Sequence, residues 1–269
     1  MGSDTAPRNR AVIGEARSCL PPAHQHPSLA EAYRRLLAAY GPQGWWPGDG
    51  PWEVMVGAVL TQHTAWRNVE RALFNLKADG PLTPERLRTL SCEELAERLR
   101  PAGTFRVKAA RLQALLSWCA RWDDDLDRMA HASPEALREE LLAVPGIGPE
   151  TADAILLYAL GIPYFVVDAY ARRIFGRLGL GPAGGTYAVY QAWLHHELPA
   201  SAEEHGEYHA LLVHHAKVAC RTVPRCAGCC LLPLCPTGQQ GAGGARPRSA
   251  SARMEAARIG MEREEQPVP

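Results

Sequence analysis

The stretch Leu142-Ala-Val-Pro-Gly-Ile-Gly-Pro-Glu-Thr-Ala152 decides the fold of this chain. It predicts one helix that ends at a Pro145-Gly146-Ile147-Gly148 turn and a second helix that begins directly after the turn. Two glycines in so tight a turn let the backbone approach another molecule closely. At the start of the second helix, unpaired N–H groups and the positive end of the helix dipole make an anion site suited to one DNA phosphate. The stretch therefore indicates a helix-hairpin-helix, which would bind DNA through its backbone and without regard to base sequence. The alternative is an ordinary turn between two helices.

The rest of the chain is also helical in its pattern. Ser91 with Glu94 predicts a capping box, and Thr83 and Ser133 each precede a proline at a first helical position. Thr64 is expected to cap the helix that follows it. The longer predicted helices cover residues 29–40, 108–120, 149–160, 169–178, 187–198 and 203–219. Because no run of residues alternates as a strand would, the sequence predicts an all-α fold.

Length, composition and charge limit the possible classes of function. The chain has 269 residues, enough for one or two domains. Hydrophobic residues make up 46%, and apolar runs are interrupted well before the roughly 20 residues of a membrane span. No secretory signal is recognised near the start, so we expect a cytoplasmic protein without membrane contact. Lys plus Arg equals Asp plus Glu at 29 each, so any DNA binding must come from a local arrangement of groups.

Five of the eight cysteines lie in one short stretch, namely Cys220, Cys226, Cys229, Cys230 and Cys235. In a reducing compartment, clustered thiols favour metal ligation over disulfides. Zinc sites usually use two separated pairs of ligands, and only one Cys-x2-Cys pair is present here. Iron–sulfur ligation is therefore preferred to zinc.

An acidic residue, Asp168, follows the hairpin in the sequence, and its distance from the hairpin bears on function. Asp168 begins a helix directly after an apolar segment, and on its own it is best interpreted as an N-cap. Together with the hairpin, it resembles the HhH-GPD superfamily of DNA base-excision glycosylases, and most of all the endonuclease III branch. In that branch the hairpin motif Leu-Pro-Gly-x-Gly-x-Lys-Thr-Ala is followed at this interval by Val-Asp. The resemblance implies that Asp168 is the catalytic aspartate.

The same resemblance extends to the cysteines. Cys220, Cys226, Cys229 and Cys235 are similar in spacing to the loop that carries a 4Fe-4S cluster in endonuclease III, although the first interval is one residue shorter. It implies that these four thiolates hold a 4Fe-4S cluster. Cys230 is the alternative cluster ligand to Cys229. Cys229 is preferred because it keeps the last two spacings.

Glu150 departs from the endonuclease III pattern. At this position endonuclease III has the lysine whose amine attacks the sugar C1′ and leads to strand cleavage. A carboxylate cannot form an imine, so AP lyase activity is expected to be absent or weak. The chemistry that remains is monofunctional: Asp168 would stabilise the oxocarbenium-like sugar and orient or deprotonate a water that attacks C1′.

The tryptophans indicate which branch of the superfamily the chain resembles. Trp45-Trp46-Pro47, Trp52 and the loop Leu60-Thr-Gln-His-Thr64 look like the 3-methyladenine DNA glycosylase III branch, whose members also have Glu at the hairpin's lysine position. The resemblance implies that Trp45, Trp46 and Trp52 form the base pocket. A flipped alkylated purine with positive charge would stack there on electron-rich rings. Core packing is the alternative for these side chains.

Further DNA contacts are implied. Gln62 is similar to the family's wedge residue, which enters the gap left by the flipped nucleotide; a plain surface glutamine is the alternative. Gly146, Ile147 and Gly148 would bind a DNA phosphate through the hairpin. Lys217 is expected to contact phosphate as well.

The resemblance implies two helical lobes. A six-helix barrel with the hairpin would cover residues 48–162, and residues 28–47 would join 163–236 in a lobe that holds the cluster. Residues 1–27 and 237–269 have the composition of disordered segments. Double-stranded DNA with a flipped damaged base would lie in the cleft between the lobes, bound by a monomer.

These observations predict a monofunctional DNA glycosylase of base excision repair that removes alkylated purines. One alternative is an endonuclease III-like glycosylase for oxidised pyrimidines. Another is a non-catalytic iron–sulfur protein that binds DNA. His205 and His209 are four residues apart on one predicted helix, but without a His-Glu-x-x-His pattern we expect no metal site there.

Overall fold

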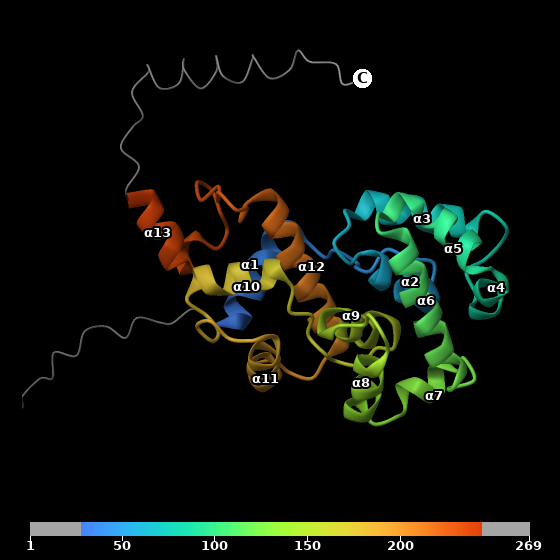
Figure 1. Cartoon of the computed structure of the whole chain (residues 1–269). Coiled ribbons are helices and arrows are strands. Elements are labelled where there is room, and N and C mark those ends of the chain that lie inside the picture. Colours follow the sequence, from blue (N-terminus) through green and yellow to red (C-terminus); the bar gives the residue numbers. More distant parts are fainter. Residues whose placement is uncertain (1–27, 244–269) are drawn as a thin grey trace, which may run out of the picture.

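A computed structural model describes residues 28–243, which form helices joined by short loops (Figure 1). No strand occurs in this part of the chain, which confirms the all-α prediction. No helix within it is long and apolar enough to cross a membrane. The elements are α1 (Leu29–Tyr40), α2 (Pro51–Leu60), α3 (Trp66–Lys77), α4 (Pro84–Thr89), α5 (Cys92–Arg98), η1 (Arg100–Ala102), α6 (Phe105–Ala120), α7 (Leu126–Ala130), α8 (Pro134–Ala143), α9 (Pro149–Ala154), η2 (Ile155–Ala159), α10 (Ala169–Leu178), α11 (Tyr187–Glu197), α12 (Ala202–Val218), η3 (Leu232–Leu234) and α13 (Pro236–Gly243).

Capping hydrogen bonds confirm several predicted helix starts. The Ser91 hydroxyl accepts a hydrogen bond from the Glu94 backbone, and the Glu94 carboxylate accepts one from the Ser91 backbone, which completes a capping box. Thr83 and Ser133 cap α4 and α8, each in front of its proline. The side chains of Thr83, Ser91 and Ser133 therefore fix where these helices begin.

Helix α2 shows no helical periodicity of polar and apolar residues in the sequence, and the loop after it differs from the prediction. Residues 53–60 are all buried, so no polar stripe marks the helix. Thr64 does not cap α3, whose N-cap is Ala65. Its hydroxyl instead donates to the Ala102 carbonyl at 2.8 Å and accepts a hydrogen bond from Lys108. The Thr64 side chain, which was expected to cap the helix, therefore forms hydrogen bonds with Ala102 and Lys108 instead.

Lys108 is wholly buried and supports this loop from inside. Its Nζ donates to the carbonyls of Leu60, at 2.6 Å, and Ala102, at 2.8 Å, and to the hydroxyl of Thr64. Desolvation lowers its pKa to about 8. Three oxygen acceptors satisfy the three donors of the ammonium group, so it holds together the ends of α2 and η1. The loop that carries Gln62 thus starts from a fixed base.

The segment 48–162 contains the helices α2 to α9, which is eight α-helices where the resemblance implied six. The difference comes from short helices such as α4, α7 and α9, which have six, five and six residues. Two apolar clusters fill this segment, one around α2, α8, α9 and η2, the other around α2, α3, α5 and α6. Helix α2 is common to both, which explains why it is buried on all sides.

Helix α1 packs with the C-terminal helices and not with its sequence neighbour α2 (Figure 1). A third apolar cluster contains Leu36 of α1, Phe175 of α10, Leu194 of α11 and Leu211 of α12. Cysteines of the stretch 220–235 pack against this cluster. The start and the end of the described chain therefore share one core.

Helix α13 corrects the predicted disordered tail, which was expected to begin at residue 237. Pro236 begins the helix, and the Cys235 carbonyl accepts a hydrogen bond from the backbone of Gln239 at 3.0 Å. The Gln239 side chain also donates to two carbonyls of η3. These contacts with the cysteine stretch stabilise a helix that glycine-rich composition disfavours. The predictions for residues 1–27 and 244–269 lie outside the described residues.

Candidate active site

Asp168 is the N-cap of α10 and directly follows a buried segment, residues 164–167. Its Oδ1 accepts a hydrogen bond from the Ala171 backbone at 2.7 Å. Its Oδ2 lies 3.6 Å from Nε2 of His209 and accepts no hydrogen bond from the part of the chain that the structure describes. One carboxylate oxygen is therefore fixed by the backbone, while the other is free to act on a bound molecule.

A buried polar network anchors the backbone in front of Asp168. The Val167 N–H donates to the hydroxyl oxygen of Tyr187 at 3.3 Å, and this hydroxyl donates to Asp153 Oδ2 at 2.7 Å. The fully buried Asp153 carboxylate also accepts hydrogen bonds from Arg138 and from a glutamine of α11. Desolvation raises the pKa of Asp153, against the hydrogen bonds from Arg138 and Tyr187. Helices α8, α9 and α11 are thus tied together one residue before Asp168.

Glu150 lies in the first turn of α9 and faces the same region as Asp168. The side chain is exposed, and no hydrogen bond to its carboxylate comes from residues 28–243. Partial desolvation by the surrounding protein and then the charge of Asp168 raise its pKa, while His209 and Arg172 lower it. Two carboxylates therefore face one space, one of them held and the other free.

The backbone conformation of the hairpin turn depends on one of its two glycines. Gly146 has φ +84°, in the left-handed region, and a Cβ there would collide with the side chain of Arg111. A Cβ at Gly148 would meet open space. The Ile147 side chain is buried in an apolar cluster, and its N–H donates to the Val144 carbonyl at 3.0 Å. Ile147 therefore supports the turn, and the exposed backbone is that of the glycines.

Gln62 fastens the loop after α2 to the hairpin. Its Nε2 donates to the Gly146 carbonyl and to the Thr151 hydroxyl, each at 3.0 Å, and its Oε1 accepts a hydrogen bond from Arg111. The side chain is half-buried, whereas the neighbouring His63 is exposed and has φ +52°. A wedge role for Gln62 would require these hydrogen bonds to break when DNA binds.

Four rings form an aromatic cage, by which we mean Trp45, Trp46, Trp66 and Tyr158. The ring centroids of Trp46 lie 5.5 Å from Trp66 and 5.3 Å from Tyr158, and those of Trp45 and Trp66 are 5.9 Å apart. The indole N–H groups of Trp45 and Trp46 are buried and have no hydrogen-bond partner in the described part of the chain. Trp52 packs against the barrel core, and no ring contact within the described residues joins it to the cage.

The cage therefore contains Trp45 and Trp46 but not Trp52, and Trp66 is its third indole ring. Trp66 begins α3, and its Nε1 donates to Glu70 at 2.9 Å. One sequence signal points to Trp66: it comes two residues after the loop that carries Gln62 and ends at Thr64, so the loop brings it back toward Trp46.

Helix α12 positions the tryptophan pair. The carboxylate of Glu207 accepts hydrogen bonds from the backbone of Gln43, at 2.6 Å, and of Gly44, at 3.3 Å, just before Trp45. Lys217, ten residues further along the chain, has its Nζ 5.9 Å from the centroid of the Trp45 ring. The ammonium group is thus placed at the cage, in a cation–π arrangement.

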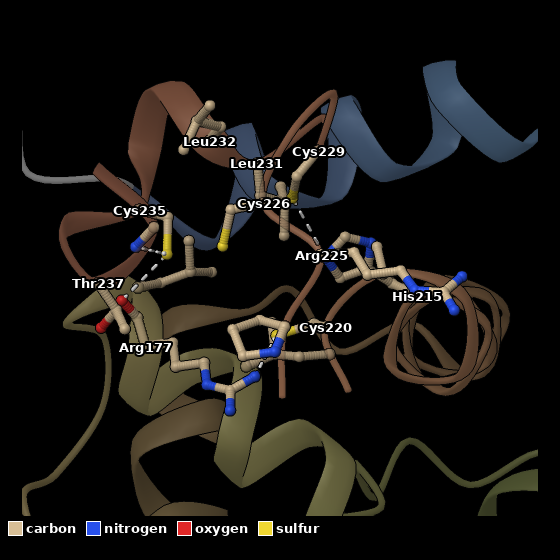
Figure 2. Close-up of a pocket in the computed structure, with 15 residues that line it drawn as sticks. Arg177, His215, Cys220, Arg225, Cys226, Cys229, Leu231, Leu232, Cys235 and Thr237 are labelled. Atoms are coloured by element: carbon tan, nitrogen blue, oxygen red, sulfur yellow. Dashed lines mark hydrogen bonds between the residues drawn. The ribbon is translucent and has the colours of Figure 1, made fainter. Parts of the chain in front are cut away.

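Cys220, Cys226, Cys229 and Cys235 line one cavity between α10, the end of α12 and α13 (Figure 2). Cys230 is not among the lining residues. Two sulfurs receive N–H groups, one from Arg177 to Cys220 at 3.2 Å and one from the backbone of Gly238 to Cys235 at 3.3 Å. The four cysteines that the spacing selected therefore surround a common space.

This arrangement can be tested against the needs of a metal group. Within residues 28–243, no three Cys, His, Asp or Glu side chains converge as the ligands of a single ion do. A 4Fe-4S cluster makes a different demand, because its four thiolates bind four different irons and stand apart. Four cysteines around one cavity, with N–H groups directed at two sulfurs, fit that demand.

The fold and the site together define an all-helical protein with a glycine-containing hairpin, an aromatic cage and a carboxylate held at a helix N-terminus. A family model described as HhH-GPD superfamily base excision DNA repair protein matches residues 56–193. The chain belongs to this superfamily, as its resemblance predicted, and is a DNA glycosylase.

Individual relatives agree with this placement. A candidate DNA repair glycosylase of Methanocaldococcus jannaschii is 42% identical over 209 residues, which are 77% of this chain and 95% of the relative. The crystal structure of the H. pylori 3-methyladenine DNA glycosylase bound to 1,N6-ethenoadenine is similar, with 27% identity, a TM-score of 0.62, and coverage of 71% of this chain and 98% of that one. Endonuclease III in a non-covalent complex with DNA shares the fold, with 23% identity, a TM-score of 0.66, and coverage of 79% and 96%.

Proposed function

We propose that this glycosylase hydrolyses the N-glycosidic bond of alkylated purines in double-stranded DNA and leaves the strand intact. The observation that carries the proposal is that the aromatic cage leads directly to Asp168: Trp46 contacts Tyr158, Tyr158 contacts His209, and His209 faces Asp168. An alkylated purine with positive charge is electron-poor, so it is attracted to the faces of indole rings. A flipped base in the cage would also offer acceptors to the two unpartnered indole N–H groups.

Asp168 would supply the chemistry. As the base leaves, positive charge develops on the sugar, and a carboxylate whose orientation is already fixed stabilises that charge at little cost of reorganisation. The free Oδ2 would orient or deprotonate the water that attacks C1′. A cationic purine is a good leaving group, so no strong general acid is needed. The cage and Asp168 are therefore sufficient for hydrolysis.

The lysines support the absence of AP lyase activity. The chain has three: Lys77, Lys108 and Lys217. Lys77 forms ion pairs with Asp49 and Glu53. Lys108 is buried and donates hydrogen bonds to three oxygens. Glu150 occupies the position where a lysine would attack C1′. Only Lys217, at Trp45, has its amine near the cage. Borohydride trapping of a DNA adduct would contradict the proposal, and the trapped residue would identify the nucleophile.

DNA itself would be held through the hairpin. Exposed backbone at Gly146 and Gly148 offers N–H groups to a phosphate, which a chain with no net charge needs. The solved endonuclease III relative contains DNA. The region beside Asp168 and Glu150 would then receive a nucleotide that has turned out of the duplex.

The four lining cysteines would hold a 4Fe-4S cluster, which in this position would stabilise the end of the chain near DNA. Because ligation contributes directly to folding, Cys229→Ser should lower the iron content and the thermal stability together. Cys230→Ser is the matched control, since Cys230 does not line the cavity. Iron analysis and visible absorbance measure both variants. Loss of iron from the Cys230 variant alone would exchange the roles of the two cysteines, and zinc in place of iron would contradict the cluster.

A lesion panel tests the reaction. Duplexes that contain 3-methyladenine, 7-methylguanine, thymine glycol or an abasic site are incubated with the protein, and the products are separated before and after alkali. Breaks at methylpurines that need alkali are expected. Breaks at thymine glycol would favour an enzyme for oxidised pyrimidines, and binding without any excision would favour a non-catalytic protein.

A further inference from the structure

Tyr158 of the aromatic cage is hydrogen-bonded to His209, which lies between the cage and Asp168. The Tyr158 hydroxyl and His209 Nδ1 are 2.7 Å apart. His209, on α12, is 6% exposed, and its Nε2 is buried and has no hydrogen-bond partner among residues 28–243. The nearest atom of Asp168, Oδ2, lies 3.6 Å from this nitrogen. A buried ring nitrogen without a partner is uncommon in a native protein and calls for an explanation.

The surroundings of the pair fix which ring nitrogen of His209 carries the proton. Burial raises the pKa of Tyr158 well above its ordinary value, so the phenol keeps its proton and donates it. Two acceptors are in reach, His209 Nδ1 at 2.7 Å and the Gly206 carbonyl at 3.2 Å, and the shorter contact favours Nδ1. The ring proton of a neutral His209 then lies on Nε2. The other tautomer would direct a nitrogen lone pair at the Asp168 carboxylate, which is repulsive.

We propose that His209 is a positioning residue for Asp168: its Nε2–H, oriented by Tyr158, donates to Asp168 Oδ2 when lesion DNA closes the site. This inference rests on the proposed role of Asp168. Active-site hydrogen bonds are often long in the free enzyme and shorten in the complex, and 3.6 Å leaves a small movement to make. With Oδ1 held by Ala171 and Oδ2 held by His209, the plane of the carboxylate is fixed.

A purely structural role for His209 makes a different prediction. The ring also contacts Phe165, with centroids 6.3 Å apart, so any substitution will disturb packing to some degree. Packing depends on volume and shape, whereas positioning depends on which atom can donate toward Asp168. Two substitutions of similar polarity separate these roles.

His209→Gln and His209→Asn form the matched pair. The amide nitrogen of Gln reaches the place of Nε2 and can still donate toward Asp168, whereas the amide of Asn reaches only the place of Nδ1, beside Tyr158. Single-turnover excision of a methylpurine from duplex DNA is measured together with DNA affinity. We expect His209→Gln to stay within about 5-fold of the wild-type rate and His209→Asn to lose about 10- to 100-fold, with DNA affinity unchanged in both. Equal losses, or losses in affinity in place of rate, would overturn the inference.

A second measurement does not depend on activity. Long-range ¹⁵N–¹H spectra of the full-length protein report the tautomer of each histidine ring, and we expect His209 to be protonated at Nε2. Tyr158→Phe removes the donor to Nδ1 and should give a mixture of tautomers. A proton on Nδ1 in the wild-type protein would overturn the inference.

The outcomes also separate this inference from the proposed function. An Asp168→Asn variant that still excises bases would refute the catalytic role of Asp168 itself. An inactive Asp168→Asn together with equal rates for the Gln and Asn variants at His209 would leave the proposed function intact and refute only the role of His209.

Discussion

The two faces of the candidate site are built in opposite ways. The hairpin face, with Gly146, Gly148 and Glu150, presents exposed backbone and a carboxylate that accepts no hydrogen bond from the residues that the structure describes. The Asp168 face presents a carboxylate that is held by a backbone N–H, faced by His209, and backed by a fully buried network around Asp153. The first face offers groups to a partner from outside, whereas the second has most of its hydrogen bonds within the protein.

This difference indicates that binding and chemistry are separable in this molecule. Changes on the hairpin face should alter DNA affinity and leave the rate of the bound complex alone. Changes on the Asp168 face should do the reverse.

Asp168→Asn should have the largest effect. Asn is isosteric and still accepts the capping hydrogen bond from Ala171, but it cannot take a proton or stabilise a developing positive charge as a carboxylate does. We expect single-turnover excision to fall by about 10²- to 10⁴-fold, with DNA affinity within about 3-fold of the wild type. Rapid-quench kinetics and fluorescence anisotropy measure the two. A variant that loses affinity and keeps its rate would break the comparison.

Gly146→Ala tests the hairpin face. The left-handed φ of +84° and the collision with Arg111 should distort the turn. We expect DNA affinity to fall by about 10-fold, which corresponds to about 1.4 kcal/mol, with the rate at saturating enzyme unchanged. Gly148→Ala is the control, because its φ is −91° and its Cβ meets open space. Similar losses in both variants would mean that the conformation of Gly146 is not what matters.

Tyr187→Phe sharpens the comparison on the other face. It removes a hydrogen-bond donor to the buried Asp153 and an acceptor for the Val167 N–H, one residue before Asp168. We expect a loss of about 1–2 kcal/mol in the free energy of unfolding and a 3- to 10-fold slower excision, without a change in affinity. Tyr190→Phe, on the same helix α11, should leave both quantities unchanged. Urea unfolding and single-turnover kinetics decide between them.

Glu150→Gln should give the smallest effect. Because folding raises the pKa of Glu150, the folded protein binds this proton more tightly than the unfolded chain does. Stability therefore falls as the pH rises from the ordinary value of 4.5 through the folded pKa, and stays lower above it. Gln cannot ionise, so the variant should be more stable than the wild type by less than about 1 kcal/mol, an advantage that grows through this pH window and is complete above it. Melting temperatures across pH measure it; an advantage confined to acid pH would reverse the assigned sign.

The sequence predicted those parts of the fold that local chemistry decides. Helices α1 and α10 have the predicted ranges 29–40 and 169–178, and Asp168 is the N-cap of α10. The all-α class followed from the absence of alternating runs. Helix α2 could not be placed in this way because it is buried on every side, and helix α13 because its stability comes from contacts with the cysteine stretch.

The candidate site was predictable only where a motif carries it. Asp168 and Glu150 follow from their distance to the hairpin, and the four lining cysteines from their spacing. Trp66, His209 and Tyr187 were not identified, because their roles depend on which helix packs beside which. Nothing in the neighbourhood of His209 in the sequence indicates that a tyrosine of η2 and the cap of α10 will meet its ring.

Helix α12 connects regions that look independent. Its 17 residues span about 25 Å. Glu207 holds the tryptophan segment, His209 faces Asp168, and His215 reaches the cysteine cavity, where its Nε2 is 3.7 Å from the Cys229 sulfur. A helix moves as a stiff rod, so a shift at its cavity end is transmitted to the other two contacts. An engineer who transplants the cysteine stretch into another member of the superfamily must carry this rod with it.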